Sequence, residues 1–191
     1  MLLDAACYFL AIDFDGDGWT DNIRAFRETC SERNVPIAVE RSKSGNGAHV
    51  WIFFEEKVPS ALARKMGSFL ITETMSRRYQ LSMKSYDRLF PNQDTLPKGG
   101  FGNLIALPFQ KDAANRGNSV FIDDGNKPYP DQWQFLSNMR KMTLLDIEGI
   151  LKDTFVGGQV LGVRVSPTDE NDPPWMMLPS GKKRFKPAIK D

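Results

Sequence analysis

Three aspartates stand within five positions of the segment FLAIDFDGDGW, residues 9–19, directly after an apolar run. The run CYFLAIDF, residues 7–14, is short and rich in aromatic and β-branched residues, which predicts a buried strand. Because residues i and i+2 of a strand point to the same face, Asp13 and Asp15 should project together from the strand end. At an effective dielectric constant near 20, two carboxylates about 4 Å apart repel by about 4 kcal/mol. The pair therefore favours a hard cation between its members, Mg²⁺ or Mn²⁺.

Two other interpretations of these aspartates fit the sequence less well. In an EF-hand calcium loop they would be alternate ligands, but that loop requires a glutamate at its last position, where Arg24 stands, and a helix before it. In a haloacid-dehalogenase site Asp13 would be the nucleophile and Asp15 the general acid. That pattern expects a hydroxyl side chain where Asp17 stands. Both departures favour the metal-binding pair.

A second polar cluster lies in ERSKSGNGAHVWIFF, residues 40–54, where a glycine turn joins two predicted strands. Glycines let backbone amides turn toward an anion, and a serine hydroxyl and nearby cations bind phosphate oxygens. The segment therefore predicts a phosphate-binding hairpin, and it contains the single histidine of the chain. The candidate nucleotide-binding residues are Arg41, Lys43, Ser44, Gly45, Gly47 and His49.

A third carboxylate is expected wherever two aspartates hold a catalytic cation. In SYDRLFPNQD, residues 85–94, Asp87 follows an aromatic residue in a short extended piece and has Arg88 beside it. Asp94 competes for this role, but its place after a proline and an asparagine is typical of a turn. Arg88 and Arg116, the latter in AANRGNS, are weaker candidates for phosphate contact.

Strands and helices are expected to alternate around these motifs. Thr20 or Asp21 should cap the first helix, and Thr143 with Asp146 should form a capping box on the last. The predicted strands are 7–14, 36–42, 48–56, 104–110 and 118–124, and the predicted helices are 19–34, 58–78, 131–139 and 143–155. This pattern indicates an α/β (α+β) fold.

The totals limit the class of protein. A chain of 191 residues fits one domain, and 41% hydrophobic residues supply a core. A formal net charge of +1 excludes a uniformly basic, histone-like binder but allows a local basic face. Cys7 and Cys30 have neither CxxC nor Cys/His spacing, which argues against a disulfide framework or a zinc site. No apolar run is long enough to span a bilayer, so a cytoplasmic protein is expected.

The end of the chain has a different composition. From residue 166 onward it contains five prolines and mixed charges. Such a segment is typical of a linker. We therefore expect a globular domain over residues 1–165 and a linker-like tail over 166–191.

The ordered set of a strand-end DxD, a Ser/Gly/His hairpin and a later lone aspartate resembles the archaeo-eukaryotic primase superfamily. Within it, the chain is most similar to the primase domain of the TOTE conflict systems of mobile elements. The stretches that carry the resemblance are FLAIDFDGDGW, ERSKSGNGAHVWIFF, SYDRLFPNQDTLPKGGFGNLIALPFQ, RGNSVFID and DQWQFL, which together run from residue 9 to about residue 136.

The resemblance implies an RRM-like mixed or antiparallel sheet flanked by helices. It also implies that Asp13, Asp15 and Asp87 are catalytic metal ligands, with the hairpin from Ser44 to His49 on the nucleotide. The ligase-type relatives have one more residue between the serine and the histidine, which leaves the phosphate contacts of Arg41 and Lys43 open.

The expected activity is that of a DNA primase-polymerase, a template-dependent nucleotidyltransferase that uses two Mg²⁺ or Mn²⁺ ions. The expected partners are a DNA template and primer, nucleoside triphosphates and, in the full-length protein, a fused helicase; no membrane is expected. A non-catalytic nucleic-acid-binding module and a metal-dependent phosphohydrolase are the alternatives. Candidate template contacts are Arg77, Arg78, Lys84, Lys98 and Lys111, with Phe101 and Trp51 for stacking, although Trp51 on its strand fits the core better.

Overall fold

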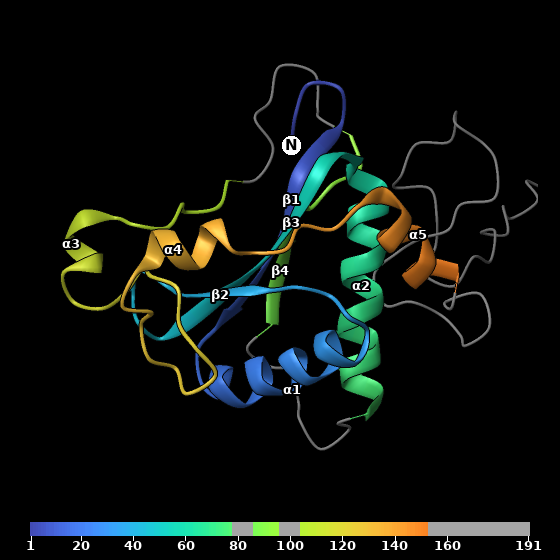
Figure 1. Ribbon diagram of the computed structural model, residues 1–191. Helices are drawn as coiled ribbons and strands as arrows, with labels where there is room; N and C mark the ends of the chain where they lie inside the picture. The colour runs from blue at the N-terminus through green and yellow to red at the C-terminus, as the bar shows by residue number, and fades with distance from the viewer. Residues whose placement is uncertain (78–85, 96–103, 153–191) are drawn as a thin grey trace, which may run out of the picture.

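A computed structural model of the protein describes residues 1–77, 86–95 and 104–152 (Figure 1). The elements are β1 (Ala6–Asp15), α1 (Trp19–Glu32), β2 (Ala38–Arg41), β3 (Gly47–Pro59), α2 (Ser60–Arg77), β4 (Tyr86–Phe90), α3 (Lys111–Ala114), α4 (Gln132–Ser137) and α5 (Leu144–Lys152). Arg78, Lys84, Lys98, Phe101 and the predicted boundary at residue 165 with its tail lie outside the described residues.

The four strands form one antiparallel sheet in the order β2-β3-β1-β4. The long β1 is therefore a central strand, paired on one side with β3 and on the other with β4. This arrangement confirms the predicted α/β class and places residues 11–14 of β1 between two neighbouring strands. The residues at the carboxyl end of β1 thus meet side chains from two other strands.

The two faces of the sheet are covered by different elements. Leu10, Ile12 and Phe14 of β1 are fully buried in the larger core, beneath the helices α1, α2 and α5. Ala11 belongs to a smaller aromatic cluster on the opposite face, under α4 and residues 105–109. Figure 1 shows the same division, with α3 and α4 apart from α1, α2 and α5. Because β1 alternates, Asp13 and Asp15 lie on the face of the smaller cluster.

The strand predicted at 104–110 is wrong, and the strand predicted at 118–124 is reduced to a short extended segment beside β2. Residues 104–110 pair with no strand of the described sheet, and Pro108 there has no backbone donor for a ladder. Residues 119–122 run beside β2 through a few backbone hydrogen bonds and one isolated bridge between Glu40 and Phe121. Phe109 and Ser119 have positive φ angles of 67° and 53°, which bend the chain out of an extended conformation at these points.

The predicted cap of α1 is also wrong. The helix begins at Trp19, and its N-cap is Gly18, which has a φ of 83° and makes no side-chain cap hydrogen bond. Glycine adopts this left-handed conformation without steric cost. The turn between β1 and α1 is therefore too tight to use Thr20 or Asp21 as the cap, and the helix starts four residues after Asp15.

The capping box of α5 is confirmed. The backbone amide of Thr143 donates to the Asp146 carboxylate at 2.9 Å, and the Asp146 amide donates to the Thr143 hydroxyl at 3.2 Å. We expect Thr143→Ala to lower the free energy of unfolding by about 1 kcal/mol, because one amide at the helix start loses its acceptor. Urea denaturation measures the change; Thr143→Ser, which keeps the hydroxyl, should lose much less.

Two residues considered as nucleic-acid contacts, Trp51 and Arg77, are engaged within the fold. The side chain of Trp51 is core, as its alternation on the strand predicts, with only 2% of the residue exposed. Arg77 is paired with Glu32 and Glu73, so its guanidinium is engaged within the fold. Across the described residues, no helix is both long enough and apolar enough to cross a membrane.

Candidate active site

A row of four polar side chains crosses the sheet at the carboxyl end of β1. Glu40 of β2 lies opposite His49 of β3, His49 opposite Asp13 of β1, and Asp13 opposite Arg88 of β4. Directly opposed residues of antiparallel strands point to the same face. Residues from four strands, 9 to 75 positions apart in sequence between Asp13 and Arg88, therefore meet in one line on the face away from α1, α2 and α5.

The predicted pair Asp13 and Asp15 lies at this end of β1 as expected from its spacing. Asp15 is exposed, and one of its oxygens accepts a hydrogen bond from the Gly16 amide at 3.0 Å. The Asp13 side chain is largely buried, with 21% of it exposed. Burial raises the pKa of Asp13, and the charges of Asp87 and Asp15 raise it further against the opposing effects of His49 and Arg88. A cation here would relieve this electrostatic cost.

A β-bulge brings Asp87 to the same place. Asp13 pairs with Arg88, but the next residue, Phe14, pairs with Tyr86, so Asp87 is an extra residue on β4. Two residues of a bulged strand oppose a single residue of the partner strand, and the bulge changes the direction of their side chains. The charge of Asp87 accordingly reaches Asp13 and raises its pKa. Asp87 is the predicted third carboxylate, whereas Asp94 pairs with Arg64.

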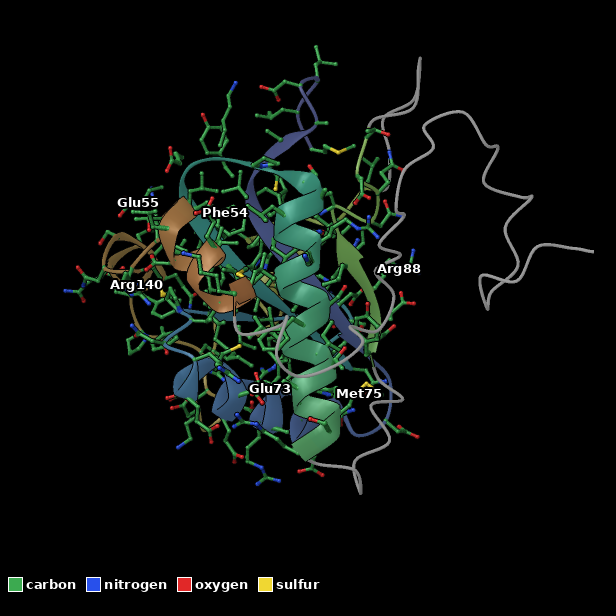
Figure 2. The ribbon with its side chains drawn as sticks, turned by 90° about the vertical axis from the view of Figure 1, so that its right-hand side faces the viewer. Phe54, Glu55, Glu73, Met75, Arg88 and Arg140 are labelled. Carbon is green, nitrogen blue, oxygen red and sulfur yellow. The ribbon has the colours of Figure 1, made fainter. Side chains whose placement is uncertain are left out.

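Arg88 holds the Asp87 carboxylate. Its Nε and Nη2 both lie 2.6 Å from the Asp87 Oδ2. Arg88 lies on β4, the edge strand beside α2 (Figure 2). Both side chains are about half exposed, at 50% and 42%. The pair is therefore accessible to a ligand, and a competing cation or phosphate can exchange with either partner.

His49 is fixed by a buried glutamate that the sequence did not single out. Glu40 is 1% exposed, and its Oε2 lies 3.0 Å from the His49 Nδ1 and accepts the Trp51 Nε1 proton at 2.9 Å. Its Oε1 accepts the Ser119 hydroxyl at 3.2 Å. Because a carboxylate accepts, Nδ1 carries the proton, and Nε2 faces the Asp13 carboxylate at 3.6 Å. The signal in the sequence that could have identified Glu40 is its position directly after apolar residues in a predicted strand that precedes the strand of His49.

The charges around His49 favour its protonated form. Burial lowers the pKa of His49, but the hydrogen bond and charge of Glu40 and the charges of Asp13 and Asp15 outweigh this effect. The pKa of His49 therefore lies above its ordinary value. A protonated imidazole placed beside the carboxylates can donate to an anionic oxygen from Nε2.

The glycine hairpin lies directly against the end of β1. A Cβ at Gly47 would lie 2.5 Å from the Phe14 carbonyl oxygen and 2.9 Å from an Asp15 carboxylate oxygen, so only glycine allows this approach. Gly45 has a φ of 83°, and the Asn118 side chain fills the space beside it. The Ser44 hydroxyl contacts Ser42 Oγ at 3.0 Å and accepts the Asn46 amide at 3.2 Å. The turn and the carboxylates thus form one continuous site.

The predicted cations differ in their availability. Arg41 donates to the Gly117 carbonyl at 2.9 Å and to the Asn126 carbonyl, which ties the loop after α3 to β2. Lys43, in the turn, and Arg116, in the loop after α3, make no ion pair with any described residue. The structure thus leaves Lys43 and Arg116 free for an anion and engages Arg41 in holding the fold.

The donor set suits a hard cation but is not preassembled. Among the described residues, no three histidine, cysteine, aspartate or glutamate side chains already converge on a point that would hold a metal ion. Asp13 and Asp15 point to one face of the sheet, and Asp87 lies next to them. The Asp87 carboxylate, however, is paired with Arg88. Oxygen ligands of this kind fit Mg²⁺ or Mn²⁺, and the repulsion at Asp13 is the cost that an ion would remove.

A comparison with family models agrees with this geometry. Residues 1–150 match the model of the Archaeo-Eukaryotic Primase domain of the TOTE conflict system. The chain belongs to this primase family. The match spans every strand and helix named above except the last two residues of α5. No curated protein matches the chain. The resemblance drawn from the motifs is thereby confirmed, and the antiparallel sheet flanked by helices is the fold expected of such a primase domain.

Membership defines the broad class of chemistry. A primase domain belongs to a family of nucleotidyltransferase type, and such domains generally use divalent metal ions. In this chain the carboxylates, the histidine and the hairpin lie together on one sheet face. This geometry is the basis for a finer assignment of activity and of individual residues.

Proposed function

We propose that this primase domain is a template-dependent nucleotidyltransferase that adds nucleotides to a 3′-hydroxyl and releases pyrophosphate. The observation that carries the proposal is the gathering of Asp13, Asp15 and Asp87 at one end of one sheet face, beside a glycine hairpin and His49. Carboxylates without the hairpin would suit many metal enzymes. Their combination with a glycine turn that carries the Ser44 hydroxyl and the Lys43 ammonium suits a nucleoside triphosphate.

Asp13, Asp15 and Asp87 would hold two Mg²⁺ or Mn²⁺ ions. When bound, the ions would supply a lowered pKa for the attacking 3′-hydroxyl and neutralisation of the triphosphate. The 3′-oxygen forms a bond to the α-phosphorus, and the bond from that phosphorus to the bridging oxygen breaks. The electron pair of that bond leaves with pyrophosphate, and the hydroxyl proton leaves to solvent or a nearby base.

The side chains around the carboxylates would position the triphosphate. The Ser44 hydroxyl can donate to its oxygens, and Lys43 can pair with its charge. His49, held by Glu40, presents Nε2 at the same edge. Arg88 would release Asp87 and pair with a phosphate when an ion takes the carboxylate. Arg41 would act indirectly, through the loop that it ties down.

Extension of a labelled primer on a DNA template tests this proposal. We expect product only with a divalent ion, and only with nucleotides complementary to the template. Release of nucleotide phosphate without chain growth would instead establish the phosphohydrolase. A folded protein that binds the template in the presence of Mn²⁺ but neither extends nor hydrolyses would establish the binding module, which the Asp87–Arg88 pair and the open carboxylate set also permit.

A further inference from the structure

An exposed tryptophan, backed by a half-buried phenylalanine, lies over the sheet face that carries the candidate active site. The indole of Trp133, on α4, is 69% exposed although it packs against the ring of Phe109, with ring centroids 4.8 Å apart. Leu107, two residues before Phe109, is 65% exposed. Large apolar side chains grouped on a surface mark a contact site more often than isolated ones do. We call Phe109 and Trp133 the aromatic pair.

The aromatic pair is held in place by the backbone. The Phe109 amide donates to the Ser119 carbonyl at 2.7 Å, and the Phe109 ring packs 5.7 Å from the ring of Phe121. The Asp131 side chain accepts the Trp133 amide at 3.0 Å and thereby fixes the start of α4. The ring of Trp133 is thus preorganised yet mostly open to solvent, which suits a surface that receives a flat ligand.

The aromatic pair shares its support with the active-site row. Phe121 belongs to the small cluster that contains Trp51, and the Trp51 ring lies 6.2 Å from His49. Ser119, which binds the Phe109 amide through its carbonyl, donates its hydroxyl to Glu40. Figure 1 shows α3 and α4 together, apart from α1, α2 and α5. The aromatic pair and the carboxylates therefore lie over the same face of the sheet.

Two cations lie on the loop between the aromatic pair and the hairpin. Residues 110–118 leave Phe109 and return to Ser119, and they carry Lys111 and Arg116 against one acid, Asp112. Asn118 at the end of the loop donates to the Lys43 carbonyl at 3.4 Å. Neither cation of the loop forms an ion pair within the described part of the chain. A polyanionic backbone would find these charges beside a stacking surface.

We propose that Trp133, backed by Phe109, stacks on a nucleobase of a single-stranded nucleic acid, with Lys111 and Arg116 contacting its backbone. Trp133 is exposed and aromatic, and Phe109, against which it packs, directly precedes a loop with cations. Exposed aromatic rings with cations bind single strands with little sequence preference. That the bound strand is the template rests on the proposed function. The binding itself does not require catalysis.

Equilibrium binding of a fluorescein-labelled single-stranded oligonucleotide to the full chain tests the inference, without metal ion or nucleotide. Trp133→Ala should weaken binding by about 5- to 100-fold, because one stacked base is lost. Trp133→Phe, which keeps an aromatic face, should retain most of the affinity. The matched control is Leu145→Ala, an equally exposed apolar residue (77%) on α5, which should bind like wild type.

Salt dependence separates stacking from charge. Trp133→Ala should keep the slope of log Kd against log salt, whereas Lys111→Ala and Arg116→Ala should each reduce it by about 1. Trp133→Ala should weaken the binding of DNA and of RNA oligonucleotides by similar factors, because base stacking does not depend on the sugar. Equal affinity of wild type and Trp133→Ala would overturn the inference and assign the exposed indole to another partner. The primer-extension result is independent of this test. If Trp133→Ala binds the oligonucleotide more weakly but the wild type does not extend a primer, the stacking site stands and only its assignment to the template is removed.

Discussion

Asp13→Asn should abolish metal-dependent primer extension while the protein stays folded. The substitution removes a carboxylate that points to the same face as Asp15 and lies beside Asp87. Losing a ligand of a catalytic cation costs several kcal/mol of transition-state stabilisation, so we expect a rate reduction of about 10³-fold or more. Extension assays with Mg²⁺ and with Mn²⁺, normalised to folded protein, give the result.

The same substitution should leave the free energy of unfolding unchanged or raise it slightly. Because burial and neighbouring charges raise the pKa of Asp13, the fold favours the neutral form, and asparagine imitates it. Asp13→Asn should therefore unfold at the same or a slightly higher urea concentration than wild type. The matched control is Asp17→Asn, which makes the same charge change two residues beyond Asp15 on an exposed position. Equal losses of activity in both variants would contradict the assignment and favour a calcium-type loop that uses all three aspartates.

Glu40→Leu should be the most destabilising substitution in the site. It leaves the Trp51 Nε1, the His49 Nδ1 and the Ser119 hydroxyl without their shared acceptor inside the protein. Unpaired buried donors cost about 1–3 kcal/mol each, so we expect a loss of about 3–5 kcal/mol in the free energy of unfolding. Urea or thermal denaturation measures it.

Glu40→Gln separates the hydrogen bonds from the charge. The amide oxygen can accept from Trp51 and His49 while its NH₂ donates to Ser119, so the loss should be only about 1–2 kcal/mol. Without the negative charge, the pKa of His49 should fall; the single histidine of the chain makes its NMR titration unambiguous. A glutamine variant as unstable as the leucine variant, or an unchanged pKa of His49, would contradict the role assigned to Glu40.

The same pKa shift has a consequence for the metal-free wild type. The folded-state pKa of His49 is raised, so its protonated form contributes stability that is fully present below the unfolded-state pKa. That contribution is lost as the pH rises through the folded-state pKa. The free energy of unfolding should therefore decline over this window, and Glu40→Gln should flatten the decline. Denaturation curves at several pH values check both statements.

Local sequence determined the parts of the site that depend on short-range periodicity. The spacing of Asp13 and Asp15 placed both on one face because strands repeat every two residues, and the register with β3 agrees. The glycines of the turn and the capping box at Thr143 follow from backbone conformations that only certain residues adopt. These features could be predicted because each depends on residues a few positions apart.

The strands predicted at 104–110 and 118–124 mark the limit of that reasoning. Their composition is that of strands, but residues 104–110 pair with no described strand and residues 119–122 make only a few backbone hydrogen bonds to β2. Positive φ angles at Phe109 and Ser119 interrupt the extended chain. Their apolar side chains Ile105, Phe109 and Phe121 pack in the smaller aromatic cluster instead. Packing against the sheet face, which composition does not encode, decided the conformation.

The sequence by itself therefore determined the family, the antiparallel α/β fold and the carboxylate, histidine and glycine motifs that a primase domain combines. Only the tertiary structure decided that a bulge brings Asp87 beside Asp13, that Glu40 holds His49, and that Arg41 holds a loop. These three facts depend on the pairing register between separate strands and on the packing of a loop against β2. Register and packing are set by contacts between residues far apart in the chain, and no local pattern records them.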